Sequence, residues 1–326
     1  MSELRRHPFL GTWVITATHR QDRTFMPPKD FCPLCPTRPG AHPTEIPAED
    51  FEIVVFDNRF PSLQSPPPEP AIGPRPYAPV RPAAGVCEVV VYSPDHETTL
   101  AELPRERVVD LVRVWTERYT ALCRRPEVEY VFIFENRGEA VGVTLSHPHG
   151  QIYAYSFIPP VLATELAHSA AYHDEHGRCL MCDILADERA QAVRLVAENR
   201  HFVAFIPFFA RYPYEVYLAP KGHRTALPEF SAEESASFAA ILQAVVKKYD
   251  ALFGFTLPYI MAMHQAPAAG AGHYHFHVEF YPPNRTATKL KWLAGSESGA
   301  GTFINDAAAE AKAAELRAAG PQSCDA

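Results

Sequence analysis

An internal repeat constrains the fold of this chain more than any other feature of its sequence. Four segments of the first half recur in the same order in the second half, which indicates two duplicated units. The matched pairs are Cys32–Cys35 with Cys179–Cys182, Phe56–Phe60 with Glu198–Phe202, Glu88–His96 with Glu215–His223, and His147–Gln151 with His273–His277. Each half also has a helical pattern between its third and fourth segments: residues 101–124, and a helix that begins at the capping-box sequence Ser231-Ala-Glu-Glu234.

The repeat predicts an α+β fold made of two similar antiparallel units, with helices packed outside the sheets. We place the units at residues 1–170 and 171–326. Their edge strands can pair into one continuous sheet. The chain has 326 residues and is 47% hydrophobic, which is enough to bury a substantial core. Prolines crowd residues 61–84, where neither a helix nor a central strand can persist.

Composition limits the compartment and the partners. No run of 18 apolar residues occurs and the first six residues begin no signal peptide, so we expect a cytoplasmic protein with no membrane partner. The net charge is −8 and the basic residues are scattered, which argues against a nucleic-acid partner. Four of the seven cysteines form two Cys-x-x-Cys pairs. In a reducing compartment this pattern favours metal ligation over disulfides.

The row His147-Pro148-His149-Gly150-Gln151 carries the predicted chemistry. In a strand, alternate side chains share one face, about 6.8 Å apart, so His147, His149 and Gln151 project together. Such a row suits attack on phosphorus: one imidazole attacks, the amide donates to a phosphoryl oxygen, and the other imidazole binds a metal ion. The alternative is two half-exposed histidines flanking a turn proline.

Two sets of cysteines and histidines predict metal sites. Cys32, Cys35, His96 and His147 form a set that zinc accepts tetrahedrally, with no position left for water, so the site would be structural and would anchor the strand of His149. A redox pair is the alternative for the thiols. By the repeat, a second zinc site would consist of Cys179, Cys182, His223 and His273.

The string Phe134–Gly138, Gly142 and His147–Gln151 closely resembles the galactose-1-phosphate uridylyltransferase family, a member of the histidine-triad superfamily. The resemblance covers nearly the whole chain and implies two joined histidine-triad repeats. It also implies that His149 is the nucleophile that becomes uridylylated. The implied reaction is double displacement, in which UMP passes from UDP-glucose to His149 and then to galactose 1-phosphate.

The resemblance further implies roles for other residues. Arg20 and Arg23 would approach the substrate phosphates, Asn58 and Arg59 the uridine and its ribose, and Asn136 and Thr144 the nucleotide's phosphates and base. The family more often has an acidic residue at the position of Arg59. Lys291 and Glu297 would reach across a homodimer to hold the hexose in the partner's site. A further ion, iron or zinc, would be held by Glu165, His264, His277 and Glu279, where one family histidine is replaced by a carboxylate. A polar cluster with no ion is the alternative.

Three other functions remain open from the sequence. The first is a sister nucleotidyltransferase or nucleoside-diphosphate-sugar phosphorylase on the same scaffold. The second is a nucleotide hydrolase, because His273-Tyr-His275-Phe-His277 has the spacing of the triad hydrolases, in which the middle histidine attacks. The third is a zinc-stabilised nucleotide-binding module without catalysis.

Overall fold

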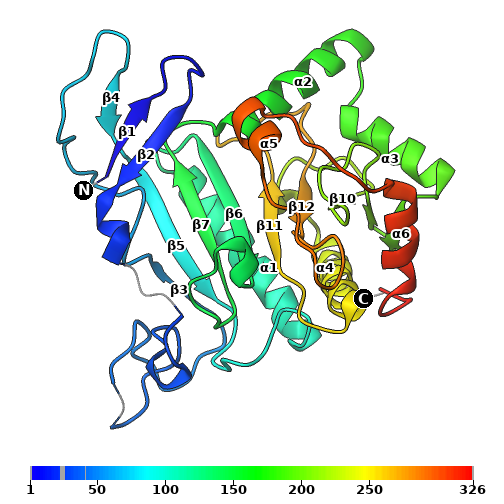
Figure 1. The fold of residues 1–326 in the computed structure, drawn as a ribbon, viewed down its shortest axis with the longest axis horizontal. Coiled ribbons are helices and arrows are strands. Elements are labelled where there is room, and N and C mark those ends of the chain that lie inside the picture. The colour runs from blue at the N-terminus through cyan, green and yellow to red at the C-terminus, as the bar shows by residue number, and fades with distance from the viewer. Residues whose placement is uncertain (1, 23–25, 41, 325–326) are drawn as a thin grey trace.

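The computed structural model describes residues 2–22, 26–40 and 42–324, and it is built on one nine-stranded antiparallel sheet (Figure 1). In spatial order the strands are β3 (Val54–Asp57), β5 (Gly85–Val91), β7 (His149–Tyr155), β6 (Tyr130–Arg137), β11 (Tyr259–His264), β12 (His277–Tyr281), β10 (Val216–Pro220), β9 (Phe202–Phe205) and β8 (Leu195–Glu198).

The strand order shows the duplication directly. The first half contributes β3-β5-β7-β6, and the second half contributes β11-β12-β10-β9 in the mirrored order, with β8 added at the edge. The halves join where β6 pairs with β11, placing Glu135 opposite Met261. The predicted α+β fold of two repeats sharing one sheet is therefore confirmed. The division at residue 170 stays a prediction; this residue lies within helix α2 (Pro160–His176).

Two long helices cover one face of the sheet, α1 (Arg105–Cys123) and α4 (Ala232–Phe253) (Figure 1). Their apolar side chains, such as Trp115 and Leu242, pack in one core with Ile133 of β6 and Met261 of β11. The predicted capping box is present at the start of α4: the Ser231 hydroxyl accepts from the Glu234 N–H at 3.1 Å, and the Ser231 N–H donates to the Glu234 carboxylate at 2.8 Å.

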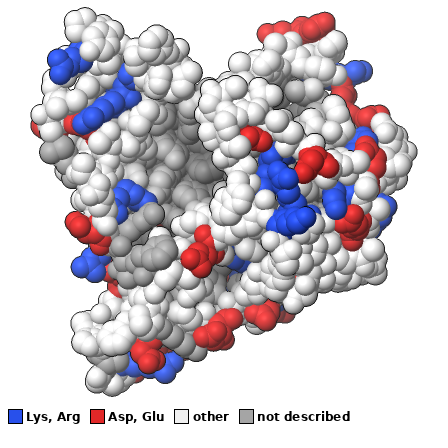
Figure 2. All heavy atoms as spheres, in the orientation of Figure 1, with Lys and Arg blue, Asp and Glu red and all other residues white. Residues whose placement is uncertain are grey.

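The other face of the sheet carries shorter elements and an open hollow. Its helices are α2, α3 (Leu180–Gln191) and α5 (Gly295–Ala300). Helix α6 (Ala309–Ala318) instead packs against α4 and β8, with Ala313 and Leu316 in the core of the long helices. Figure 2 shows a hollow between the N-terminal segment and the second half, over the strands of the first half. Helix α2 continues to His176 and ends at Gly177, whose φ of 67° is the left-handed conformation common at helix C-termini.

A small sheet and short turns complete the chain. Strand β1 (Ser2–Arg6) lies between β2 (Trp13–Ala17) and β4 (Val80–Pro82), so the one strand of the proline-rich segment is an edge strand. The 3₁₀ turns are η1 (Thr18–Asp22), η2 (Lys29–Phe31), η3 (Glu139–Val141) and η4 (Leu227–Glu229). Among the described residues, none of the helices has the length and apolar character needed to cross a membrane.

Candidate active site and metal centres

A cavity of about 210 Å³ opens on the first half of the sheet, on the face away from α1. Its apolar walls include Leu34, Phe56 and Val89. Its polar lining includes most of the predicted substrate contacts of the first half, namely Arg20, Asn58, Arg59, Asn136, Thr144, His149 and Gln151. Arg59 also pairs with Glu45 at 2.9 Å at the cavity wall. Arg23, the other predicted phosphate contact, lies outside the described residues.

His149 stands at the start of β7 with its ring fixed in one tautomer. Its Nδ1 lies 2.8 Å from the backbone oxygen of His147, and a carbonyl only accepts, so Nδ1 carries the proton and Nε2 carries a lone pair. Burial lowers the pKa of His149 below its ordinary 6.5, which keeps the ring neutral at pH 7. The ring therefore offers a nucleophilic nitrogen beside Gln151, which lines the same cavity.

The first predicted metal set is assembled next to this strand. One ligand atom from each of Cys32, Cys35, His96 and His147 lies within 4.8 Å of the others. Cys35 Sγ is 3.3 Å from His96 Nδ1 and 3.5 Å from His147 Nδ1. The Nε2–H of His147 donates to the Ser93 oxygen at 2.8 Å, which leaves Nδ1 unprotonated and facing the thiols. This donor set and tautomer fit a tetrahedral ion.

The second cluster corrects one predicted ligand. Cys179, Cys182 and His223 lie together as expected, but the fourth member is His275 and not His273. Cys182 Sγ is 3.4 Å from His275 Nδ1, and the Nε2–H of His275 donates to the Pro220 oxygen at 3.0 Å, the same arrangement as at His147. The paired imidazoles have ring centroids 5.2 Å apart in both clusters.

Strand register explains the correction. In the first half β5 pairs Val89 with Gln151, and in the second half β10 pairs Tyr217 with Glu279. Each pair lies on the sheet face away from the long helices, so Glu279 corresponds to Gln151, His277 to His149 and His275 to His147. The predicted match of His147–Gln151 with His273–His277 is therefore wrong by two residues. A shift of two keeps every side chain on the same face, so alternation alone could not detect it.

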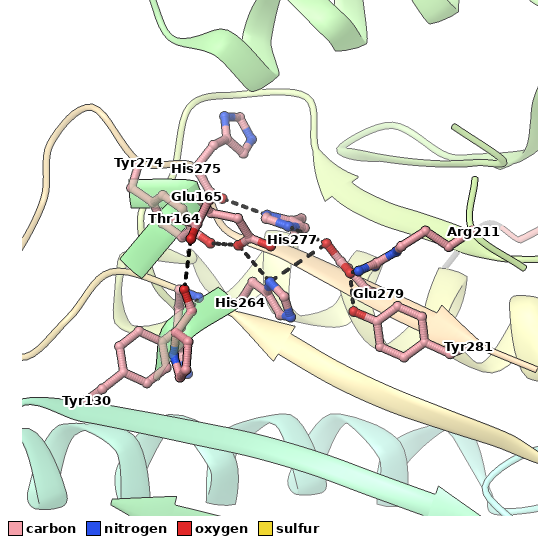
Figure 3. A network of polar contacts seen from close by, with 12 residues as sticks. Tyr130, Thr164, Glu165, Arg211, His264, Tyr274, His275, His277, Glu279 and Tyr281 are labelled. Carbon is pink, nitrogen blue, oxygen red and sulfur yellow. Dashed lines mark hydrogen bonds and ion pairs between the residues drawn. The ribbon is translucent and has the colours of Figure 1, made fainter. Parts of the chain in front are cut away.

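A third cluster brings together Glu165 of α2, His264 of β11, and His277 and Glu279 of β12 (Figure 3). His264 Nδ1 is 2.8 Å from Glu165, and His277 Nε2 is 3.1 Å from Glu279. Burial would lower the pKa of His264, but the carboxylates of Glu279 and Glu165 raise it above its ordinary value. Burial would raise the pKa of Glu279, yet His264, His277 and Arg211 hold it well below its ordinary value. All four predicted members of this set are thus side by side.

The tautomer of His277 tests whether the third cluster fits a metal ion. Its Nδ1–H donates to the His275 oxygen at 3.0 Å, so the Nε2 lone pair points at a carboxylate oxygen of Glu279. Two acceptors at this distance need a proton or a metal ion between them. Arg211 binds the other oxygen of Glu279 at 2.7 Å, and Tyr281 donates to it as well (Figure 3). The set of two imidazoles and two carboxylates fits a metal ion.

Comparison with known proteins identifies the family. The profile of the galactose-1-phosphate uridyl transferase N-terminal domain matches residues 1–159, and that of the C-terminal domain matches residues 165–322. The chain is 42% identical to a galactose-1-phosphate uridylyltransferase of Thermotoga maritima, with 97% of this chain and 98% of that protein covered. The chain belongs to the galactose-1-phosphate uridylyltransferase family.

Other relatives of the family agree. The Haemophilus influenzae galactose-1-phosphate uridylyltransferase is 34% identical, covering 96% of this chain and 93% of that one. A solved structure described as a uridylyltransferase superposes with a TM-score of 0.87 at 35% identity, covering 97% of each chain. A plant ADP-glucose phosphorylase from Arabidopsis thaliana, at 22% identity and a TM-score of 0.72 over 98% of this chain and 99% of that one, shares the fold.

Lys291 and Glu297, the two residues predicted to hold the hexose, do not line the cavity that contains His149. Lys291 is buried and its Nζ donates to Glu297 at 3.0 Å, which lowers the pKa of Glu297 to about 2. Within the described part of the chain, the residues that line the His149 cavity all lie between Arg20 and Tyr153. Lys291 and Glu297 are therefore paired with each other, away from their own chain's cavity.

Residues that sequence reasoning missed are the partners of the predicted ones. Arg211 joins Glu279 to Glu215, with its guanidinium 2.9 Å from Glu215. Glu45 neutralises Arg59 at the cavity wall. Arg211 and Glu215 are four residues apart, but they lie in a loop outside any helix, so this spacing alone did not predict their contact. The contacts of Arg211 with Glu279 and of Arg59 with Glu45 depend on tertiary folding. For His275, only a correct strand register would have provided the signal.

Proposed function

We propose that this chain exchanges UMP between UDP-glucose and galactose 1-phosphate through a uridylyl-histidine at His149. The observation that supports this most directly is the tautomer of His149, which presents an unprotonated Nε2 to a cavity that also contains Gln151. The family membership supports the substrates, since its relatives bear the name galactose-1-phosphate uridylyltransferase.

In the first step His149 Nε2 attacks the α-phosphorus of UDP-glucose. A nitrogen–phosphorus bond forms, the bond from that phosphorus to the bridging oxygen breaks, and glucose 1-phosphate leaves with the bonding electrons. The amide N–H of Gln151 donates to a non-bridging oxygen as negative charge builds on it. Arg20, at the cavity wall, faces the phosphates, and Asn58 and Asn136 bind the nucleoside and its phosphates.

In the second step a phosphate oxygen of galactose 1-phosphate attacks the same phosphorus from the side that glucose 1-phosphate left. The nitrogen–phosphorus bond breaks, its electrons return to His149 Nε2, and UDP-galactose forms. Both sugar phosphates use one subsite in turn, which predicts ping-pong kinetics. The His147 carbonyl keeps the His149 ring in the same tautomer in both steps, because it accepts a hydrogen bond from the Nδ1–H.

We propose zinc for the two cysteine-histidine clusters and iron or zinc for the third. Zinc held by Cys32, Cys35, His96 and His147 would supply rigidity to the strand that carries His149. Cys179, Cys182, His223 and His275 would hold the equivalent ion of the second half. The third set has harder oxygen ligands, from Glu165 and Glu279, which suit iron as well as zinc.

We also propose that the protein is a cytoplasmic homodimer that binds only these small-molecule substrates, neither nucleic acid nor membrane. Lys291 and Glu297 do not line the cavity of their own chain. In a homodimer they would reach the cavity of the partner chain. Trp292 and Leu293, beside Lys291, are 70% and 51% exposed, which is the apolar surface that a subunit contact would cover.

The hydrolase alternative is not supported by the geometry. It requires His275 as the nucleophile, but the Nε2–H of this ring donates to Pro220 and its Nδ1 faces Cys179 and Cys182. No lone pair is left for a substrate. His277, the counterpart of His149 in the strand register, has its Nε2 directed at Glu279 at 3.1 Å, so it does not supply a free nucleophile either.

Mass spectrometry after incubation with UDP-glucose alone tests the proposal. We expect a UMP adduct on His149, and its loss in His149→Ala. Adding galactose 1-phosphate should then discharge the adduct as UDP-galactose, whereas discharge by inorganic phosphate alone would indicate a phosphorylase. Absence of any adduct on the wild-type protein would overturn the proposal.

A further inference from the structure

We propose that Tyr92 and Glu135 are positioning residues that set the depth of His149 in its cavity. Neither residue touches the cavity. The inference rests on the proposed function only in that its main assay follows uridylylation of His149.

The contact that carries the inference lies on the back of β7. His149 and Gln151 face the cavity, so Gly150 between them faces the core formed with α1. A Cβ atom placed on Gly150 would lie 2.3 Å from the hydroxyl oxygen of Tyr92. The Tyr92 hydroxyl therefore lies directly against the backbone of the strand, at the residue that separates the nucleophile from the amide donor. Only glycine leaves room for it.

The chain around Tyr92 holds the same strand at two further points. The Tyr92 backbone N–H donates to the Pro148 oxygen at 3.3 Å, and the oxygen of the next residue, Ser93, accepts from His147 at 2.8 Å. The ring itself packs edge-on against Trp115 of α1, with ring centroids 6.1 Å apart. Residues 92 and 93 thus contact His147, Pro148 and Gly150, on both sides of His149 along the chain.

Glu135 fixes the Tyr92 hydroxyl in turn. The hydroxyl donates to one carboxyl oxygen of Glu135 at 3.0 Å, and the other oxygen accepts from the Tyr259 hydroxyl at 2.8 Å. Glu135 is only 5% exposed, and burial raises its pKa. A buried carboxyl group is costly unless both oxygens have partners. Here both do, so the Tyr92 hydroxyl is needed to satisfy Glu135, and Glu135 in turn fixes that hydroxyl.

The carboxyl group also connects the nucleophile to the second half. Tyr259 belongs to β11, which pairs with β6 where the halves join (Figure 1). Arg137 lies over the Tyr259 ring at 4.3 Å and pairs with Asp250 of α4. The chain of contacts from Gly150 through Tyr92 and Glu135 to Tyr259 therefore couples the position of His149 to the joint between the repeats.

Removing single hydroxyl or carboxylate groups tests the inference. Attack on phosphorus is slowed by displacements of the nucleophile of even a fraction of about 1 Å. We therefore expect Tyr92→Phe and Glu135→Gln to slow uridylylation in a single turnover about tenfold or more. The affinity for UDP-glucose should stay unchanged. Tyr119→Phe is the matched control, since it removes a buried hydroxyl of α1 that donates to Ala266 at 2.8 Å, away from β7. Wild-type rates in Tyr92→Phe would overturn the inference.

A second pair of variants tests the contact itself. Gly150→Ala should nearly abolish uridylylation because its methyl group meets the Tyr92 hydroxyl. Tyr92→Phe removes that oxygen, so the double variant should react faster than Gly150→Ala alone. A double variant no faster than Gly150→Ala would contradict the contact. The same rescue should appear in the melting temperature, which needs no activity. If the wild-type protein forms no adduct, the proposed function fails while the thermal comparison still decides whether Tyr92 sets the strand.

Discussion

The assignment of His275, rather than His273, to the second metal cluster predicts different metal contents for variants of these two residues. His275→Gln removes one of four ligands, whereas His273→Gln changes a half-buried histidine outside all three clusters. If each cluster holds one ion, the wild-type protein contains three ions per chain. We expect two in His275→Gln and three in His273→Gln.

The loss of an ion has a calculable effect on stability. An ion present at about 100 times its dissociation constant stabilises the folded state by about 2.7 kcal/mol. An unfolding entropy of about 2.1 cal/mol/K per residue gives about 0.7 kcal/mol/K for 326 residues. The melting temperature should therefore fall by about 4 °C for each ion lost.

The assay combines elemental analysis of dialysed protein with thermal unfolding, with and without a strong chelator. Because His275 also donates to Pro220, its replacement costs some stability without any metal. The chelator comparison removes this contribution: the chelator-dependent fall in melting temperature should be about 4 °C smaller in His275→Gln than in the wild type. A lost ion in His273→Gln, or a full metal content in His275→Gln, would refute the assigned register.

Three further predictions concern the chemistry. Since burial lowers the pKa of His149, its single-turnover uridylylation rate should stay constant as the pH falls to the ordinary imidazole value of 6.5 and decline only below it; a decline that begins above 6.5 would contradict this. Gln151→Glu should slow the same step by about 10²- to 10³-fold, more than Gln151→Ala, because a carboxylate repels the phosphoryl oxygen; equal rates in the two variants would count against a donor role. Glu279→Gln should lower the metal content by one ion, and unchanged content would show that the third cluster binds no metal through this side chain.

Sequence alone was sufficient where a motif fixes both residue type and spacing. The first cluster was predicted in full, because Cys32-x-x-Cys35 occurs once in the first half and His96 and His147 stand next to recognisable strands. The duplicated fold followed from the recurrence of segments, and the sheet bears it out.

Sequence reasoning failed where several residues of one type alternate along a strand. In an extended chain His273, His275 and His277 would share a face, so the sequence pattern cannot show which of them faces the thiols. The pairing of β10 with β12 and the contacts of His275 with the thiols decide it, and both are tertiary information. A smaller error has the same origin: matching Glu88 with Glu215 is off by one residue, since the register aligns Val89 with Tyr217.

The correspondence of His277 with His149 has an evolutionary consequence. Duplication produced two strands with an imidazole at the same place, and their neighbours then diverged. In the second copy the ring is stacked on Tyr217, with centroids 5.4 Å apart, and faces Glu279 where the first copy has Gln151. An acidic neighbour favours cations over phosphates, so the carboxylate of Glu279 suits the second imidazole to a cation, whereas the amide of Gln151 suits the first to an anionic ligand. The two imidazoles at equivalent places in the repeat therefore have neighbours that favour ligands of opposite charge.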